Sequence, residues 1–285
     1  MSNSTISEKP ALRILDIHVS EVEKYPNTLK DIMFNRSFEG MIIRGVLSPE
    51  TVEQVVSRLE NGAMKSLYST RPTQNVDRKY KPIEVYGQTL LGTSSSDMKK
   101  YFDCATAFRQ ESSILFQGHL GLEERIGAVL HGLSGLPVRV PNGSEEGQTY
   151  TPATIRVLFE GNEIPIHAGN QLIRVPQHEH LNTLIDTTDQ FSYFIPITVP
   201  EVGGELIIYS LEWNPKEKSE EKAVDPMVEQ KYESVAVAPG PGDMLVFDAG
   251  RYYHRVTRVS GSRPRRTIGG FMAFSKQHDT FYYWS

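Results

Sequence analysis

The chain has 285 residues, of which 39% are hydrophobic and 23% charged, a composition typical of a soluble globular protein. A formal net charge of -5 argues against a nucleic-acid-binding surface, and the single cysteine, Cys104, excludes an intrachain disulfide. Residues 1–10 lack the apolar core of a secretory signal, and no apolar run approaches the roughly 20 residues of a membrane helix. We therefore expect a cytoplasmic protein that binds neither nucleic acid nor membrane.

The first half of the chain predicts helices and short strands that support a later core. Residues 1–10 are expected to form a flexible tail, and residues 11–137 the helical and strand support. The clearest helix begins at Ser48, a favourable N-cap followed by proline, and ends at Asn61 before a glycine. Further expected elements are strands at 11–17 and 41–47, a helix at 19–36 with a break near Pro26, and two helices between 98 and 133.

Two segments carry little regular pattern. Residues 64–98 are rich in Ser, Thr, Lys and Gln, apart from an apolar stretch at 83–91. A segment of this length is either a functional lid over a site or a variable surface loop, and the sequence supports both interpretations. Residues 214–233 are dense in Lys and Glu, which predicts a solvated loop.

Residues 138–285 predict the core of the fold. Short apolar runs alternate there with proline and glycine, and we expect strands at 153–159, 164–166, 192–199, 205–209, 234–238, 244–247, 254–259 and 267–274. About eight strands at this spacing indicate a double-stranded β-helix, or cupin-like jelly roll, with helices packed on one face. The predicted fold class is therefore mainly β with flanking helices, in a single domain over residues 1–285.

A histidine at the end of an apolar run, in residues 164–170 (IPIHAGN), is the first candidate metal ligand. In iron oxygenases that bind metal through two histidines and one carboxylate, the second position after the first histidine is Asp or Glu. Here it is Gly169. If His167 binds a metal, Gly169 leaves one coordination position without a protein ligand, and an anion from solution is free to bind there.

The second candidate ligand, His254, follows a tight turn and an apolar strand at residues 239–247 (PGPGDMLVF). Arg265 and Arg266 stand about ten residues further on, at the next predicted strand. An iron and 2-oxoglutarate site needs such an arginine, because a planar guanidinium suits the carboxylate that does not reach the metal. The alternative is ordinary surface charge at a strand start. Spacing favours Arg265 over Arg266.

These residues resemble the iron(II)/2-oxoglutarate-dependent oxygenase superfamily, whose fold is the double-stranded β-helix. The chain is still more similar to the freestanding halogenases that chlorinate indole alkaloids of the hapalindole and welwitindolinone type. This resemblance runs from end to end and is weakest at residues 64–92 and 214–233. The segments that carry it are residues 35–38 (NRSF), 147–156 (GQTYTPATIR), 189–196 (DQFSYFIP) and 281–285 (FYYWS).

The resemblance implies roles for individual residues. His167 and His254 would bind iron(II), and Gly169 would open the position for chloride. Ser192 would lie near the metal and help to orient the oxidant, and Arg265 would bind 2-oxoglutarate. The implied cofactors are iron(II), 2-oxoglutarate, chloride and O2, and the implied reaction removes hydrogen from an unactivated aliphatic carbon and returns chloride to it.

The implied substrate is a free indole alkaloid of the hapalindole or fischerindole type. An apolar polycycle needs an apolar cavity, and no patch that would dock a carrier protein is evident in the sequence. Four apolar residues fall in segments able to reach the metal, although each is also compatible with an ordinary core position: Ile83, Leu91, Ile164 and Leu172.

Three other functions remain open at the level of sequence. The first is a hydroxylase or desaturase of a small molecule, which normally carries a carboxylate where Gly169 stands. The second is a jelly-roll binding module without a redox metal. The third is a zinc hydrolase that uses His178 and His180, although no strand pattern supports that pair.

Overall fold

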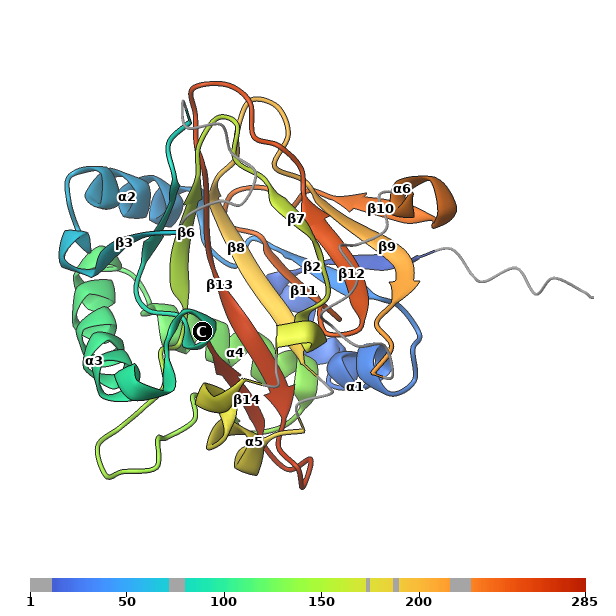
Figure 1. The fold of residues 1–285 in the computed structure, drawn as a ribbon, viewed down its shortest axis with the longest axis horizontal. Helices are drawn as coiled ribbons and strands as arrows, with labels where there is room; N and C mark the ends of the chain where they lie inside the picture. The colour runs from blue at the N-terminus through green and yellow to red at the C-terminus, as the bar shows by residue number, and fades with distance from the viewer. Residues whose placement is uncertain (1–11, 72–79, 173–174, 187–189, 216–226) are drawn as a thin grey trace, which may run out of the picture.

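The computed structural model describes residues 12–71, 80–172, 175–186, 190–215 and 227–285 (Figure 1). The expected tail at residues 1–10, and residues 72–79 and 216–226 of the two weakly patterned segments, lie outside the described residues.

Two β-sheets make up the centre of the molecule (Figure 1). Within the described residues, the large sheet has ten strands and the small sheet has four. The path through the large sheet is β1 (Ile14–His18), β2 (Gly40–Arg44), β11 (Met244–Phe247), β8 (Phe191–Thr198), β13 (Arg265–Phe274), β6 (Thr154–Leu158), β4 (Ile83–Tyr86) and β3 (Tyr68–Arg71), with β14 (Phe281–Trp284) beside β13 and β5 (Val138–Arg139) beside β14. The small sheet runs β10 (Ser234–Val237), β9 (Leu206–Glu212), β12 (Tyr252–Val256) and β7 (Ile164–His167).

Each of the eight expected core strands is present. The support region at residues 11–137 also contributes strands to the large sheet, in addition to its helices. Strand β2 lies between β1 and β11, and its first four residues are buried because helices cover one face and the small sheet the other. Strands β3 and β4, from the weakly patterned segment, extend the opposite edge of the large sheet. The segment that was expected to be a lid or a loop therefore contains part of the sheet.

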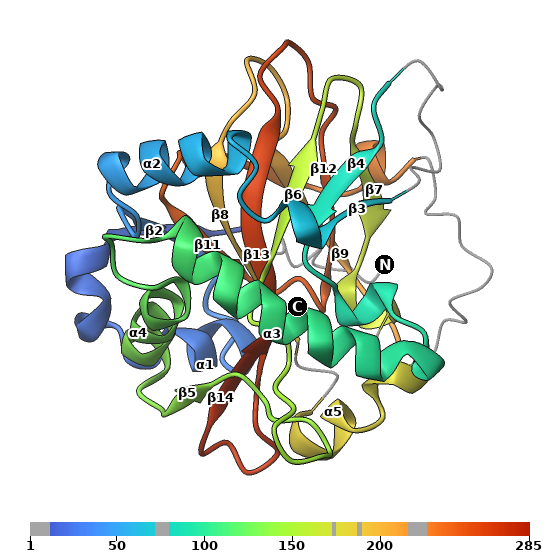
Figure 2. The ribbon, with the colours of Figure 1, turned by 90° about the vertical axis from the view of Figure 1, so that its left-hand side faces the viewer.

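Helices cover the outer face of the large sheet (Figure 2). The α-helices are α1 (Thr28–Met33), α2 (Pro49–Glu60), α3 (Met98–Leu115), α4 (Leu122–Ser134), α5 (Leu181–Leu184) and α6 (Val228–Lys231). Short 3-10 turns are η1 (Val19–Lys24), η2 (Lys65–Leu67), η3 (Leu90–Gly92), η4 (Ser95–Asp97), η5 (Gly169–Leu172) and η6 (Pro176–His178). The helix expected at 19–36 is thus divided into η1 and α1, at the predicted break. Ser48 caps α2 as predicted, since its side chain accepts a hydrogen bond from the Thr51 amide at 3.1 Å.

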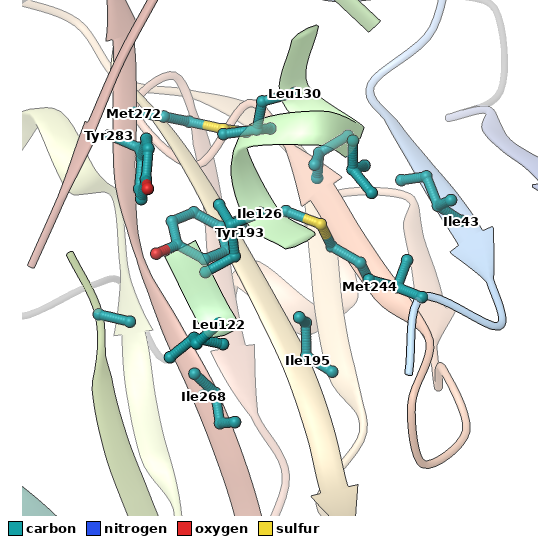
Figure 3. Packing of buried hydrophobic residues seen from close by; sticks show 14 of the residues in the cluster. Ile43, Leu122, Ile126, Leu130, Tyr193, Ile195, Met244, Ile268, Met272 and Tyr283 are labelled. Carbon is teal, nitrogen blue, oxygen red and sulfur yellow. The ribbon is translucent and has the colours of Figure 1, made fainter. Parts of the chain in front are cut away.

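Alternation along β8 and β13 sorts their side chains between two layers. Figure 3 shows side chains of α4 packed against residues from the helix-covered face of these two strands. The residues of that layer include Leu122, Ile126 and Leu130 from α4, Tyr193 and Ile195 from β8, and Ile268 and Met272 from β13. Each fully buried aliphatic side chain contributes roughly 1.5–3 kcal/mol to the hydrophobic stabilisation. This layer therefore holds the large sheet in place while its other face remains available for a site.

The opposite face of β8 and β13 points toward the small sheet and lines a cavity between the two. Ser192 and Phe194 come from β8, and Arg265 and Thr267 from β13. Among the described residues, no helix is long and apolar enough to span a bilayer.

Candidate metal centre

Strands β7 and β12 bring the two predicted histidines together. His167 and His254 are direct partners in the antiparallel register, and their ring centroids are 4.3 Å apart. The Nδ1 atom of His167 lies 2.8 Å from the carbonyl oxygen of Pro165, and that of His254 lies 2.9 Å from the carbonyl oxygen of Tyr252. A carbonyl oxygen only accepts, so Nδ1 of each ring carries the proton and donates. This leaves Nε2 of each ring with a free lone pair, as metal binding requires.

Burial keeps both imidazoles neutral. It lowers the pKa of His254 well below the ordinary value of 6.5, and the neighbouring His167 lowers it further. It also lowers the pKa of His167, with the positive charge of Arg156 acting in the same direction. Two neutral rings with free Nε2 atoms suit a divalent transition metal.

The third position of the motif is the buried Gly169, held in place through its backbone. Its amide donates to the carbonyl oxygen of Ala249 at 2.7 Å, and the next amide, of Asn170, donates to that of Gly250 at 3.2 Å. These two bonds attach the turn after β7 to the turn after β11. A Cβ atom at residue 169 would lie 3.1 Å from the Ala249 carbonyl oxygen and 3.1 Å from Nε2 of Gln190, so the site is tight but not closed to a side chain.

A cavity of about 600 Å3 opens onto these residues. It contains nearly all of the predicted site. The predicted residues that line it are His167, Gly169, Ser192, His254, Arg265, Ile83, Leu91 and Ile164. The Leu172 side chain lies outside the described residues, although its backbone ends η5. Ile83 and Leu91 come from the weakly patterned segment, so that segment does reach the cavity.

The two candidate arginines lie on opposite faces of β13. Arg265 is only 5% exposed and lines the cavity, where Nε donates to the carbonyl oxygen of Gly204 at 2.8 Å and the guanidinium lies 5.1 Å from the Phe194 ring centroid. Arg266 points to the helical layer and pairs with Glu60 of α2 at 2.9 Å. Of these two, Arg265 is therefore the one placed to bind a ligand of the cavity, which supports the preference from spacing.

Two further arginines in the cavity were not among the predicted site residues. Arg71 hydrogen-bonds to the Thr89 hydroxyl, and Arg156 occupies the middle of β6. The signal for Arg156 was present, since a single arginine between Ile155 and Val157 in an apolar strand must face away from the core that these neighbours enter. That this other face lines the cavity follows only from the assembled sheets.

The second histidine pair does not form a comparable site. His178 is 2% exposed, burial lowers its pKa to about 4, and its Nδ1 has no hydrogen-bond partner among the residues that the structure describes. The Nδ1 atom of His180 instead lies 3.1 Å from the hydroxyl oxygen of Tyr150. Within the described part of the chain, no three His, Cys, Asp or Glu residues gather as a metal-binding group. The geometry therefore gives no support to a zinc hydrolase built on His178 and His180.

Comparison with known proteins supports the same reading of the chain. A family model described as carrier-protein-independent halogenase WelO5 matches residues 11–285. No match is found among curated protein sequences.

Solved structures of similar fold include an N-substituted L-amino acid dioxygenase from Burkholderia ambifaria AMMD, which is 12% identical with a TM-score of 0.56 over 94% of this chain and 90% of that chain. Another is the non-heme alpha ketoglutarate dependent epimerase SnoN from nogalamycin biosynthesis, which is 12% identical with a TM-score of 0.51 over 89% of this chain and 85% of that chain. At this identity the likeness concerns the fold alone. It confirms the predicted jelly-roll core with flanking helices.

Proposed function

The chain belongs to the carrier-protein-independent halogenase family, an iron(II)- and 2-oxoglutarate-dependent class of oxidoreductase, and from this premise we propose that it chlorinates an unactivated aliphatic carbon of a free hapalindole- or fischerindole-type indole alkaloid. The observation that carries the proposal is the adjacent pair of neutral histidines with Gly169 at the position of the usual carboxylate. Chloride would occupy the position that the glycine leaves open.

Iron(II) and 2-oxoglutarate, together with chloride and O2, supply the oxidant that removes hydrogen from carbon and the halide that replaces it. His167 and His254 would hold the metal through Nε2, because the carbonyl oxygens of Pro165 and Tyr252 fix both rings in the required tautomer. Arg265 lines the same cavity, and its guanidinium would bind the far carboxylate of 2-oxoglutarate.

Positioning of the substrate decides between chlorination and hydroxylation, because small displacements have large effects when a reacting atom chooses between two neighbours. Ser192 lies in β8 on the cavity side, opposite Phe271 of β13 in the strand register. From there its hydroxyl would donate a hydrogen bond into the cavity. We assign Ser192 the role of helping to orient the oxidant that iron would supply.

The cavity also suits an uncharged polycyclic substrate. Its volume of about 600 Å3 falls within the usual range for small-molecule sites. Aliphatic surface comes from Ile83 of β4, Leu91 of η3 and Ile164 of β7. These three residues would contact the alkaloid, and the family description removes any need for a carrier protein.

The proposal is tested by mass spectrometry of a reconstituted reaction with iron(II), 2-oxoglutarate, ascorbate, O2, chloride and a hapalindole- or fischerindole-type alkaloid. We expect a product with the isotope pattern of chlorine. A product that gains oxygen only would identify a hydroxylase despite Gly169. Succinate formation without modification of any alkaloid would refute the substrate class and leave the metal chemistry standing.

A further inference from the structure

The proposed mechanism leaves two cavity arginines unexplained, and of these Arg71 donates to the Thr89 hydroxyl, whereas Arg156 has no such partner among the described residues. It lies in the middle of β6, opposite Thr267 of β13 and opposite Val85 of β4 in the two strand registers. Its neighbours Ile155 and Val157 are buried, and the side chain of Arg156 lines the cavity. Two paired strands therefore fix this cation on the inner face of the large sheet.

Within the described residues, nothing neutralises Arg156. No carboxylate or hydrogen-bond acceptor is paired with its guanidinium, and the charges that act on it are those of Arg71 and Arg265, both positive. Arg265 is better provided for, with the Gly204 carbonyl oxygen as acceptor and the charge of Glu205 nearby. Arg156 is half-buried in the cavity wall. A cation that loses part of its hydration without gaining a partner is costly, and a bound anion would offset that cost.

The two arginines serve different parts of the cavity. In the strand registers Arg265 lies opposite Leu158, whereas Arg156 lies opposite Thr267, two residues further along β13 toward Phe271, the partner of Ser192. Arg265 instead reaches the loop before β9 through Gly204. Along the strand direction, Arg156 is thus the cation closer to Ser192. A ligand that spans the distance between them needs an anionic group at each end.

We propose that Arg156 binds the carboxylate at the 2-oxo end of 2-oxoglutarate, beside His167, while Arg265 binds the carboxylate at the far end. The inference rests on the use of 2-oxoglutarate by the proposed function and adds a second anchor to it. A guanidinium suits this role because it can donate two hydrogen bonds to one carboxylate while the metal binds the other side.

Two other ligands for Arg156 fit the structure less well. The side of the centre at Gly169 is faced by the Ala249 carbonyl group and the Gln190 amide, which supply the three atoms nearest to a Cβ there. Chloride at that position would therefore meet Gln190 before Arg156. The proposed alkaloid carries no anionic group, so it cannot neutralise the charge of Arg156.

The test compares Arg156→Leu with the matched control Arg265→Leu in two equilibrium titrations. Each iron(II)-loaded protein is titrated without oxygen, first with 2-oxoglutarate and then with 2-oxopentanoate, which keeps the 2-oxo acid end but lacks the far carboxylate. Binding is followed by the visible charge-transfer absorption of the iron–2-oxo acid complex and by calorimetry. Neither measurement depends on turnover.

We expect Arg156→Leu to weaken the binding of both compounds by the same factor, about 10- to 100-fold, because hydrogen bonds to a charged group are lost. Arg265→Leu should weaken 2-oxoglutarate and leave 2-oxopentanoate unchanged. Arg156→Lys keeps the charge and the fold but cannot donate two parallel hydrogen bonds to one carboxylate. It should therefore show an intermediate loss of affinity for both compounds.

An unchanged affinity for 2-oxopentanoate in Arg156→Leu and Arg156→Lys would overturn the inference. So would a loss confined to chloride affinity, measured by the chloride-dependent shift of the same absorption band. A wild-type protein that binds neither compound would refute the proposed function itself, which separates that failure from the failure of the second anchor.

Discussion

Substitution of Gly169 by aspartate tests the open position directly. The backbone of Gly169 is outside the left-handed region, so a side chain is not excluded by conformation. A Cβ would lie 3.1 Å from both the Ala249 carbonyl oxygen and Nε2 of Gln190, so these neighbours must shift by a few tenths of an ångström. We expect this crowding to lower the free energy of unfolding by about 1–3 kcal/mol.

The effect on the reaction should be much larger than the effect on stability. A carboxylate attached to residue 169 competes with chloride from solution for the same position, with the advantage of being tethered beside the metal. Even a modest preference of about 1.4 kcal/mol reduces chloride occupancy tenfold. We therefore expect Gly169→Asp to lose at least about 90% of the chlorinated product and to form a hydroxylated product in its place.

The assay is the ratio of chlorinated to hydroxylated product by mass spectrometry, measured across a chloride titration. Gly169→Ala is the matched control, because it adds the same Cβ contacts without a ligand atom. It should keep chlorination, and both variants should lose thermal stability by similar amounts. Undiminished chlorination in Gly169→Asp would refute the open-site argument. Equal loss in both variants would show that the volume of the side chain, rather than a ligand, controls the halide.

Three further predictions concern other parts of the molecule. Ser192→Ala should lower the ratio of chlorinated to hydroxylated product several-fold with little change in 2-oxoglutarate consumption; an unchanged ratio would remove its orienting role. Burial lowers the pKa of His178 to about 4, so the stability that depends on its neutral form is complete above pH 6.5 and is lost as the pH falls toward 4. In denaturant titrations, the free energy of unfolding should therefore fall between these pH values, and in His178→Leu it should fall by up to about 3 kcal/mol less than in the wild type. A parallel fall in both proteins would contradict this. Ser48→Ala removes the acceptor for the Thr51 amide and should cost about 1 kcal/mol, whereas Ser48→Asp should restore it; equal unfolding midpoints for all three proteins would refute the cap.

Local sequence determined the elements whose causes are local. Ser48 followed by proline predicts the start of α2 because a side-chain oxygen satisfies an amide that the helix leaves free. The eight core strands follow from short apolar runs between proline and glycine, and the motif at 164–170 identifies a histidine with no carboxylate after it. Each of these signals lies within a few residues of the feature that it predicts.

Tertiary structure decided what depends on partners far away in the chain. The sequence requires Arg265 and Arg266 to point to opposite faces of a strand, because side chains alternate, but α2 and the small sheet decide which face is the cavity. The pairing of His167 with His254 depends in the same way on β7 and β12 meeting in one register. The inward direction of Arg156 depends on β6 lying between β13 and β4. Such choices depend on the packing free energy of whole layers, to which any single residue contributes little.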